Sequence, residues 1–219
     1  MKEIKAFIIK DIRYELRKQS TINGLILYMA AIVFIAYLSF LHVYAIDENT
    51  WNALYWIILI FASMNAVSGT FVNENANRQY YFYLLAKPRS IILSKIAYNA
   101  VLVLMLSLLS YLLFILFMGN KAQNQVMFVL NIILGSTGLS AILTFVSAIS
   151  SRTDNNFTLM AILGFPLLLP FLLILMKIAA CAISGNAWDT VILYFLLIII
   201  LDALVLLLAI ILFPYLWRD

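Results

Sequence analysis

Residues that could carry out chemistry are few in this sequence, and they lie far apart. His42 is the only histidine and Cys181 the only cysteine, which excludes an intrachain disulfide and any metal site built from several imidazoles or thiolates. None of the seven glycines is followed by lysine, so the chain lacks the GxxxxGK[ST] loop that binds ATP phosphates. The metalloprotease motif HExxH and the hydrolase motif GxSxG are also absent. We therefore expect that the chain is not an enzyme and that any ATP hydrolysis occurs in a partner subunit.

Several polar residues lie inside long apolar stretches. A carboxyl at the depth of Asp202 is costly in a membrane and suggests a function, the alternatives being a protonated carboxyl or one bonded to a neighbouring helix. Ser140 and Thr144 share one helix face, as is typical of closely packed helices, with a polar transport path as the alternative. His42 could ligate a haem iron, but a lone histidine between tyrosines and an acidic break is more often an interfacial residue.

The elements that position these residues are membrane-spanning helices. The chain has 219 residues and is 65% apolar and 11% charged, against about 45–50% and about 25% in soluble domains. So little polar surface cannot cover a soluble core, and so high a hydrophobicity excludes disorder. Lipid offers no partner to backbone groups, so each span must be helical, and a core of about 30 Å needs about 20 residues. The stretches that fit are 22–45, 51–72, 91–118, 126–150, 157–182 and 190–216.

Positive charges indicate how these spans are oriented. Of the 14 lysines and arginines, only Lys121 and Lys177 fall on the side opposite the amino-terminal arm. The positive-inside rule therefore assigns both termini to the cytoplasm. We predict an all-α integral membrane protein with six transmembrane helices, which form a single domain over residues 1–219.

The amino-terminal arm, residues 1–21, is predicted to be an amphipathic helix. Apolar residues recur at three- and four-residue spacing from Ile4 to Leu16, and lysines and arginines occupy most other positions. Such a helix lies in the headgroup plane with its apolar stripe in the acyl boundary. The alternative is a solvated basic arm that only fixes the topology.

The longest polar break, residues 73–90 (NENANRQYYFYLLAKPRS), is the second cytoplasmic element. We expect it to project as a short helix that Pro88 stops, after which the chain re-enters the membrane at Ile91. Exposed aromatic and arginine side chains favour a protein interface, and an interfacial tyrosine belt is the alternative. The candidate contact residues are Glu74, Arg78, Tyr80, Tyr81, Phe82 and Tyr83.

Taken in order, these features resemble the permease subunit of the cytochrome c maturation haem exporter, the CcmB family of ABC-2-like permeases. The resemblance runs from YELR at 14–17 through LLAKPRSIILSK at 84–95 and LGSTGL at 134–139 to LGFPLLLP at 163–170. The two prolines of the last stretch are expected to bend or break its helix. The aromatic stretch 78–83 stands where the family has a glycine. The resemblance therefore implies the role of this segment but not the individual residues that make its contacts.

The resemblance implies an ABC-2-like bundle in which two permease copies sit on two copies of a cytoplasmic ABC ATPase. Segment 73–90 would dock into the ATPase, with Glu74, Arg78 and the aromatic residues as candidate coupling residues. ATP would bind to that partner, haem is a possible substrate, and no cofactor is expected on this chain. The outcome would be haem export, or release of a haem-loaded periplasmic chaperone from a haem-handling membrane subunit. The location implied is the bacterial cytoplasmic (inner) membrane, with the lipid bilayer and no nucleic acid as a partner.

Three other functions stay open. The chain could be an ABC-2 permease for a lipid-linked or peptide substrate, or a membrane assembly factor that transports nothing. It could also be an intramembrane enzyme that uses Asp202.

Overall fold

The computed structural model describes residues 7–10, 19–40, 46–72, 87–151 and 156–216. Within these ranges the chain is helical and contains no strand. Residues 7–10 are helical, and a short 3₁₀ helix, η1, covers Trp188–Thr190. The longer helices are α2 (Gln19–Phe40), α3 (Glu48–Val72), α5 (Pro88–Met118), α6 (Gln125–Ser150), α7 (Asn156–Ile183) and α8 (Ile192–Leu216).

Six of the described helices are long and apolar enough to cross a membrane, which confirms the predicted all-α membrane fold. Their ends fall close to the predicted limits because polar clusters interrupt the apolar stretches. The helix α5 has 31 residues, which at about 1.5 Å per residue is longer than a hydrocarbon core of about 30 Å. It must therefore tilt or extend past the core.

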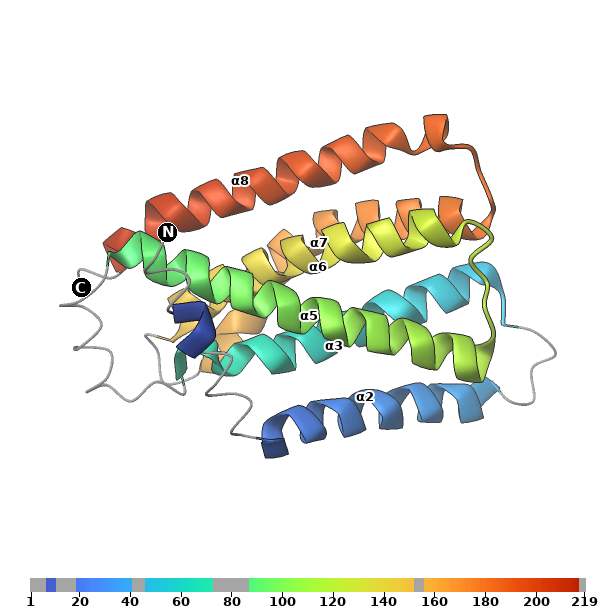
Figure 1. Cartoon of the computed structure of the whole chain (residues 1–219), viewed down its shortest axis with the longest axis horizontal. Coiled ribbons are helices and arrows are strands. Elements are labelled where there is room, and N and C mark those ends of the chain that lie inside the picture. The colour runs from blue at the N-terminus through green and yellow to red at the C-terminus, as the bar shows by residue number, and fades with distance from the viewer. Residues whose placement is uncertain (1–6, 11–18, 41–45, 73–86, 152–155, 217–219) are drawn as a thin grey trace.

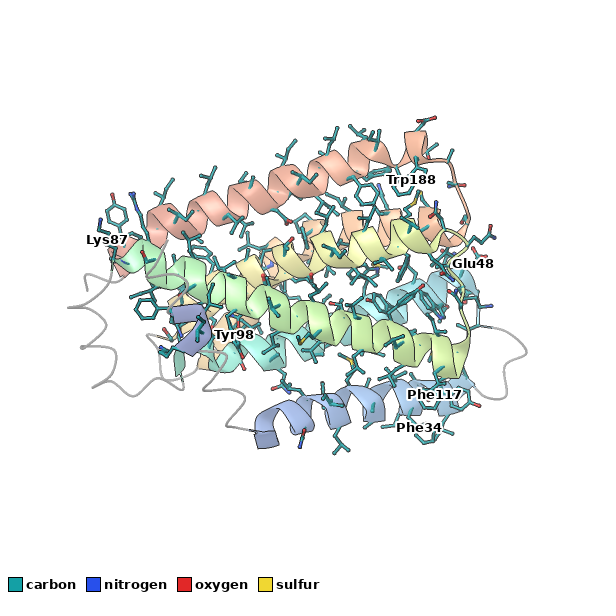
Figure 2. The ribbon with its side chains drawn as sticks, in the orientation of Figure 1. Phe34, Glu48, Lys87, Tyr98, Phe117 and Trp188 are labelled. Carbon is teal, nitrogen blue, oxygen red and sulfur yellow. The ribbon has the colours of Figure 1, made fainter. Side chains whose placement is uncertain are left out.

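The helices run alternately up and down, so that α2 begins and α8 ends at the same end of the bundle (Figure 1). Lys87 lies at this end, which we call the inner end, whereas Glu48 and Trp188 lie at the opposite, outer end (Figure 2). The positive-inside rule assigns the inner end to the cytoplasm.

Helix α6 is the centre of the bundle. It contacts α3, α5, α7 and α8, and its residues from Leu139 to Ala148 are all buried. Gly135 and Gly138 let neighbouring helices approach α6 closely, as small residues do in membrane helices. By contrast, α2 and α8 lie at the periphery and expose most of their apolar side chains.

Prolines affect two of the helices. Helix α5 begins at Pro88, three residues before the predicted re-entry at Ile91, because the N–H that proline lacks would have no helical partner at this position anyway. The helix predicted to end before Pro88 falls on residues outside the described part. Helix α7 continues through Pro166 and Pro170, so the prolines do not break it. Neighbouring helices and local adjustments can satisfy the backbone groups that a proline frees in a membrane span.

Of the predicted amino-terminal helix, residues 7–10 and 19–21 lie within the described part; residues 7–10 are helical, and residues 19–21 form the start of α2. Phe7 packs partly buried against the core of the bundle. The ammonium nitrogen of Lys10 lies 5.5 Å from the centroid of the Phe7 ring.

Candidate functional site

Many of the predicted site residues lie outside the described residues. These are His42, Glu74, Arg78, Tyr80, Tyr81, Phe82 and Tyr83. Their roles stay predictions. Asp202 lies in α8, and Ser140 and Thr144 lie in α6.

The last turn of α3 and the first turns of α5 meet at the inner end, on either side of segment 73–86. Lys95 of α5 is only 4% exposed, and its Nζ donates a hydrogen bond to the carbonyl oxygen of Thr70 at 2.8 Å. Thr70 lies in the last turn of α3, where carbonyls have no helical donor and a positive charge is favoured. The same Nζ lies 4.8 Å from the centroid of the Phe71 ring, a cation–π contact. Lys95 therefore caps the end of the helix that leads into the segment.

Asn99, one helical turn after Lys95, joins three helices. It is fully buried, and its Nδ2 donates to Thr144 Oγ1 of α6 at 2.8 Å and to Thr70 Oγ1 of α3 at 3.2 Å. Thr70 Oγ1 in turn lies 3.3 Å from Asn99 Oδ1. The predicted residue Thr144 thus forms a bond between helices.

Ser147 extends this group by one turn of α6. Its Oγ lies 3.4 Å from the carbonyl oxygens of both Val67 and Ser68 in α3. Phe71, the residue after Thr70, contacts α8, with the centroid of its ring 5.8 Å from that of Phe213. We define the inner polar cluster as Thr70 of α3, Lys95 and Asn99 of α5, and Thr144 and Ser147 of α6.

Ser140 is buried as well but bonds within its own helix, where its Oγ donates to the carbonyl oxygen of Thr137 at 2.8 Å. It therefore lies on the buried face of α6 that carries Thr144, yet its hydroxyl makes no described bond to another helix.

Asp202 bonds to a neighbouring helix. Its Oδ2 lies 2.9 Å from Thr137 Oγ1 of α6, which is also 2.8 Å from the carbonyl oxygen of Leu134. The Thr137 hydroxyl donates to Asp202 Oδ2 or to the carbonyl oxygen of Leu134, because it has one proton for the two acceptors. The other carboxyl oxygen is buried and has no hydrogen-bond partner among the described residues, which is unfavourable for a polar atom.

The outer end holds a second cluster, made of aromatic rings. The outer aromatic cluster consists of Trp51, Tyr55 and Trp56 of α3, Tyr111 and Phe114 of α5, and Phe128 of α6. The rings of Trp51 and Tyr55 are stacked with centroids 6.0 Å apart, and those of Tyr111 and Phe128 are 4.9 Å apart. The Tyr55 hydroxyl also donates to the carbonyl oxygen of Ser107 at 3.1 Å.

Two asparagines tie α7 to the same end. Asn52 Nδ2 of α3 donates to the carbonyl oxygen of Met176 at 2.8 Å, and Asn131 Nδ2 of α6 donates to that of Leu175 at 2.9 Å. These bonds and the rings hold α3, α5, α6 and α7 together at the outer end.

Sequence reasoning missed Lys95, Asn99 and Thr70. Lys95 enters the sequence-based predictions only as a cytoplasmic charge and as the last residue of the stretch LLAKPRSIILSK, and the other two residues do not enter them. The signal that could have found them is a lysine followed four residues later by an asparagine within the apolar stretch 91–118. Polar residues inside a span face protein, and this spacing places both on one helix face.

The fold and the site together define a multi-pass membrane protein, a bundle of long apolar helices joined by buried polar and aromatic contacts. Within the residues described, no group of three histidine, cysteine or acidic side chains could hold a metal ion. The family model for CcmB protein matches residues 2–215, so the chain belongs to the CcmB family. Searches of curated proteins and of solved structures found no match. Membership of this family makes the chain an ABC transporter permease component of haem export in cytochrome c maturation.

Proposed function

We propose that this chain, as one transmembrane domain, is driven by a separate cytoplasmic ABC ATPase that docks on segment 73–90. The observation that carries this proposal is the bond between Lys95 and Thr70, which brings the two helices flanking the segment together at the inner end. A segment that leaves and re-enters the membrane at one point of the positively charged end is well placed to receive a cytoplasmic partner. The chain has no GxxxxGK[ST] loop, so ATP binds to that partner.

The complex proposed contains two permease copies and two ATPase copies in a bacterial cytoplasmic membrane. Its other members are a haem-handling membrane subunit and a periplasmic haem chaperone. Closure of the ATPase pair on ATP moves the segments and rocks the spans. The result is haem export, or release of the haem-loaded chaperone.

The ATPase contact is tested with the double variant Arg78→Glu/Tyr81→Ala, purified in a gentle detergent. We expect this variant to insert normally but to lose the ATPase, because a reversed charge and a lost aromatic ring remove interface anchors. Lys121→Glu, a charge reversal at the outer end, is the matched control and should retain the ATPase. Undiminished co-purification of the double variant would contradict the docking role.

The haem substrate is tested by complementation. A deletion strain should lack c-type cytochromes, and the wild-type chain should restore them. Normal c-type cytochromes in the deletion strain would instead favour a permease for a lipid-linked or peptide substrate. Normal function with an ATPase partner that cannot hydrolyse ATP would favour a non-transporting assembly factor.

A further inference from the structure

We propose that the inner polar cluster is the joint that transmits movement of segment 73–86 to the rest of the bundle, with Lys95 as its main positioning residue. This inference rests on the proposed function, because it assumes that a partner moves the segment. It assigns a role to residues that lie inside the bundle and not on the surface that the partner contacts.

The inner polar cluster lies where the chain enters and leaves segment 73–86. Thr70 lies two residues before the end of α3, and Lys95 lies two turns into α5. The segment is therefore joined to the bundle through two helices that bond to each other directly at its base, at 2.8 Å. A push or a pull on either arm of the segment reaches the same contact.

The helices of the cluster are joined by hydrogen bonds and not by apolar packing alone. Membrane helices gain little from the hydrophobic effect when they pack, and apolar side chains give no directional bonds that fix the register of two helices. Hydrogen bonds in a low-dielectric interior are strong and directional. Asn99 bonds to α3 and to α6 at once, so a rotation of α5 must carry both neighbours along or break a bond.

The contacts of the inner polar cluster extend beyond α3 and α5 to two further helices. Thr144 and Ser147 connect the end of α3 to the central helix α6. Phe71, which lies under the Lys95 ammonium, contacts Phe213 at the inner end of α8. A displacement of the cluster can therefore be transmitted to α6 and α8 through direct contacts between side chains.

The test separates coupling from assembly. Lys95→Met keeps the length of the side chain but removes its donor, and Thr144→Val keeps the shape but removes the acceptor for Asn99. We expect both variants to bind the ATPase at wild-type levels and to retain ATP hydrolysis in the purified complex. The amount of c-type cytochrome in complemented cells should fall by about two- to tenfold, the range for one net hydrogen bond.

Two control variants accompany them. Lys177→Met removes an exposed lysine at the outer end, and Ser140→Ala removes a buried hydroxyl that bonds only within α6. Both should support normal cytochrome levels. Lys95→Arg retains a cationic donor and should recover part of the activity that Lys95→Met loses, which a simple packing role would not predict.

The outcomes distinguish this inference from the proposed function. If the wild-type chain binds no ATPase, the proposed function fails. If it binds an active ATPase but Lys95→Met and Thr144→Val give normal cytochrome levels, only the joint is wrong. If Lys95→Met lowers the amount of the complex, the test rests on Thr144→Val. If Thr144→Val then lowers the amount of cytochrome only in proportion to the amount of complex, the proposed role of the inner polar cluster is wrong.

Discussion

A methyl group at Gly138 would test how closely α6, α7 and α8 meet in the middle of the bundle. A Cβ placed there would overlap Asp202 Oδ1 of α8 and Phe171 Cζ of α7, and would lie 2.6 Å from Phe171 Cε2. Phe171 is only 1% exposed, so its ring has little room to turn away. Gly138→Ala must therefore displace α7 or α8, and overpacking of this kind costs about 1–3 kcal/mol.

Two other glycines provide graded controls for this substitution. At Gly164 the nearest atoms to an added Cβ are Leu168 Cδ1 at 3.7 Å and Val146 Cγ1 at 4.0 Å, which are ordinary contacts. Gly164→Ala should leave stability unchanged or raise it by about 0.5–1 kcal/mol, because alanine favours a helix more than glycine does. Gly135→Ala should fall between the two, since its nearest contacts, at 3.0–3.2 Å, require the neighbouring side chains to shift by only a few tenths of an ångström.

The assay is thermal unfolding of the purified protein in detergent, followed by tryptophan fluorescence. A cost of about 2 kcal/mol corresponds to a fall of about 4–8 °C in Tm for a chain of this size. The double variant Gly138→Ala/Asp202→Ala should lose less stability than the two single variants added together, because one of the overlapping atoms is gone. A Gly138→Ala variant as stable as Gly164→Ala would refute the close packing of the three helices.

Three further predictions use the same unfolding assay. Asp202→Asn should melt like the wild type, because the amide oxygen can accept from Thr137 Oγ1 as the carboxyl oxygen does, whereas Asp202→Leu should melt lower. Equal melting of the two variants would contradict this bond. Tyr55→Phe should lose about 0.5–1.5 kcal/mol, because it removes a buried hydrogen bond to a backbone carbonyl of α5; an unchanged Tm would contradict this. Hydrogen bonds from the side chain and backbone N–H of Thr50 lower the pKa of Asp47 below its ordinary value of 3.8. The stability that ionised Asp47 adds is therefore present above that value and lost as the pH falls below it, so Asp47→Asn should melt with less acid sensitivity than the wild type.

The membrane spans could be predicted from the sequence because their limits are set by composition. The stretches 51–72 and 126–150 match α3 and α6 to within three residues, since an apolar stretch must end where polar residues begin. The start of α5 lies at Pro88, three residues before the predicted start at Ile91, because a proline opposes a helix that precedes it but favours one that begins with it.

The pairing of polar residues could not be predicted in the same way. A span that is apolar on all sides gives no periodicity from which to infer which face meets which neighbour. Thr70 and Asn99 are 29 residues apart, and Thr137 and Asp202 are 65 residues apart, so only the rotation of each helix brings them together. The predicted contact residues of segment 73–90 lie outside the described part of the chain, and their roles stay predictions.

The two clusters imply where the bundle can move and where it cannot. The outer aromatic cluster and the inner polar cluster both join α3, α5 and α6, so these three helices are fixed to one another at both ends. Helices α2 and α8 lie outside this unit and expose most of their apolar side chains. A displacement that enters at Lys95 should therefore move α3, α5 and α6 as one body and change their contacts with the peripheral helices. The bond between Asp202 and Thr137 lies on one of those boundaries, between α8 and α6, where relative movement would break or remake it.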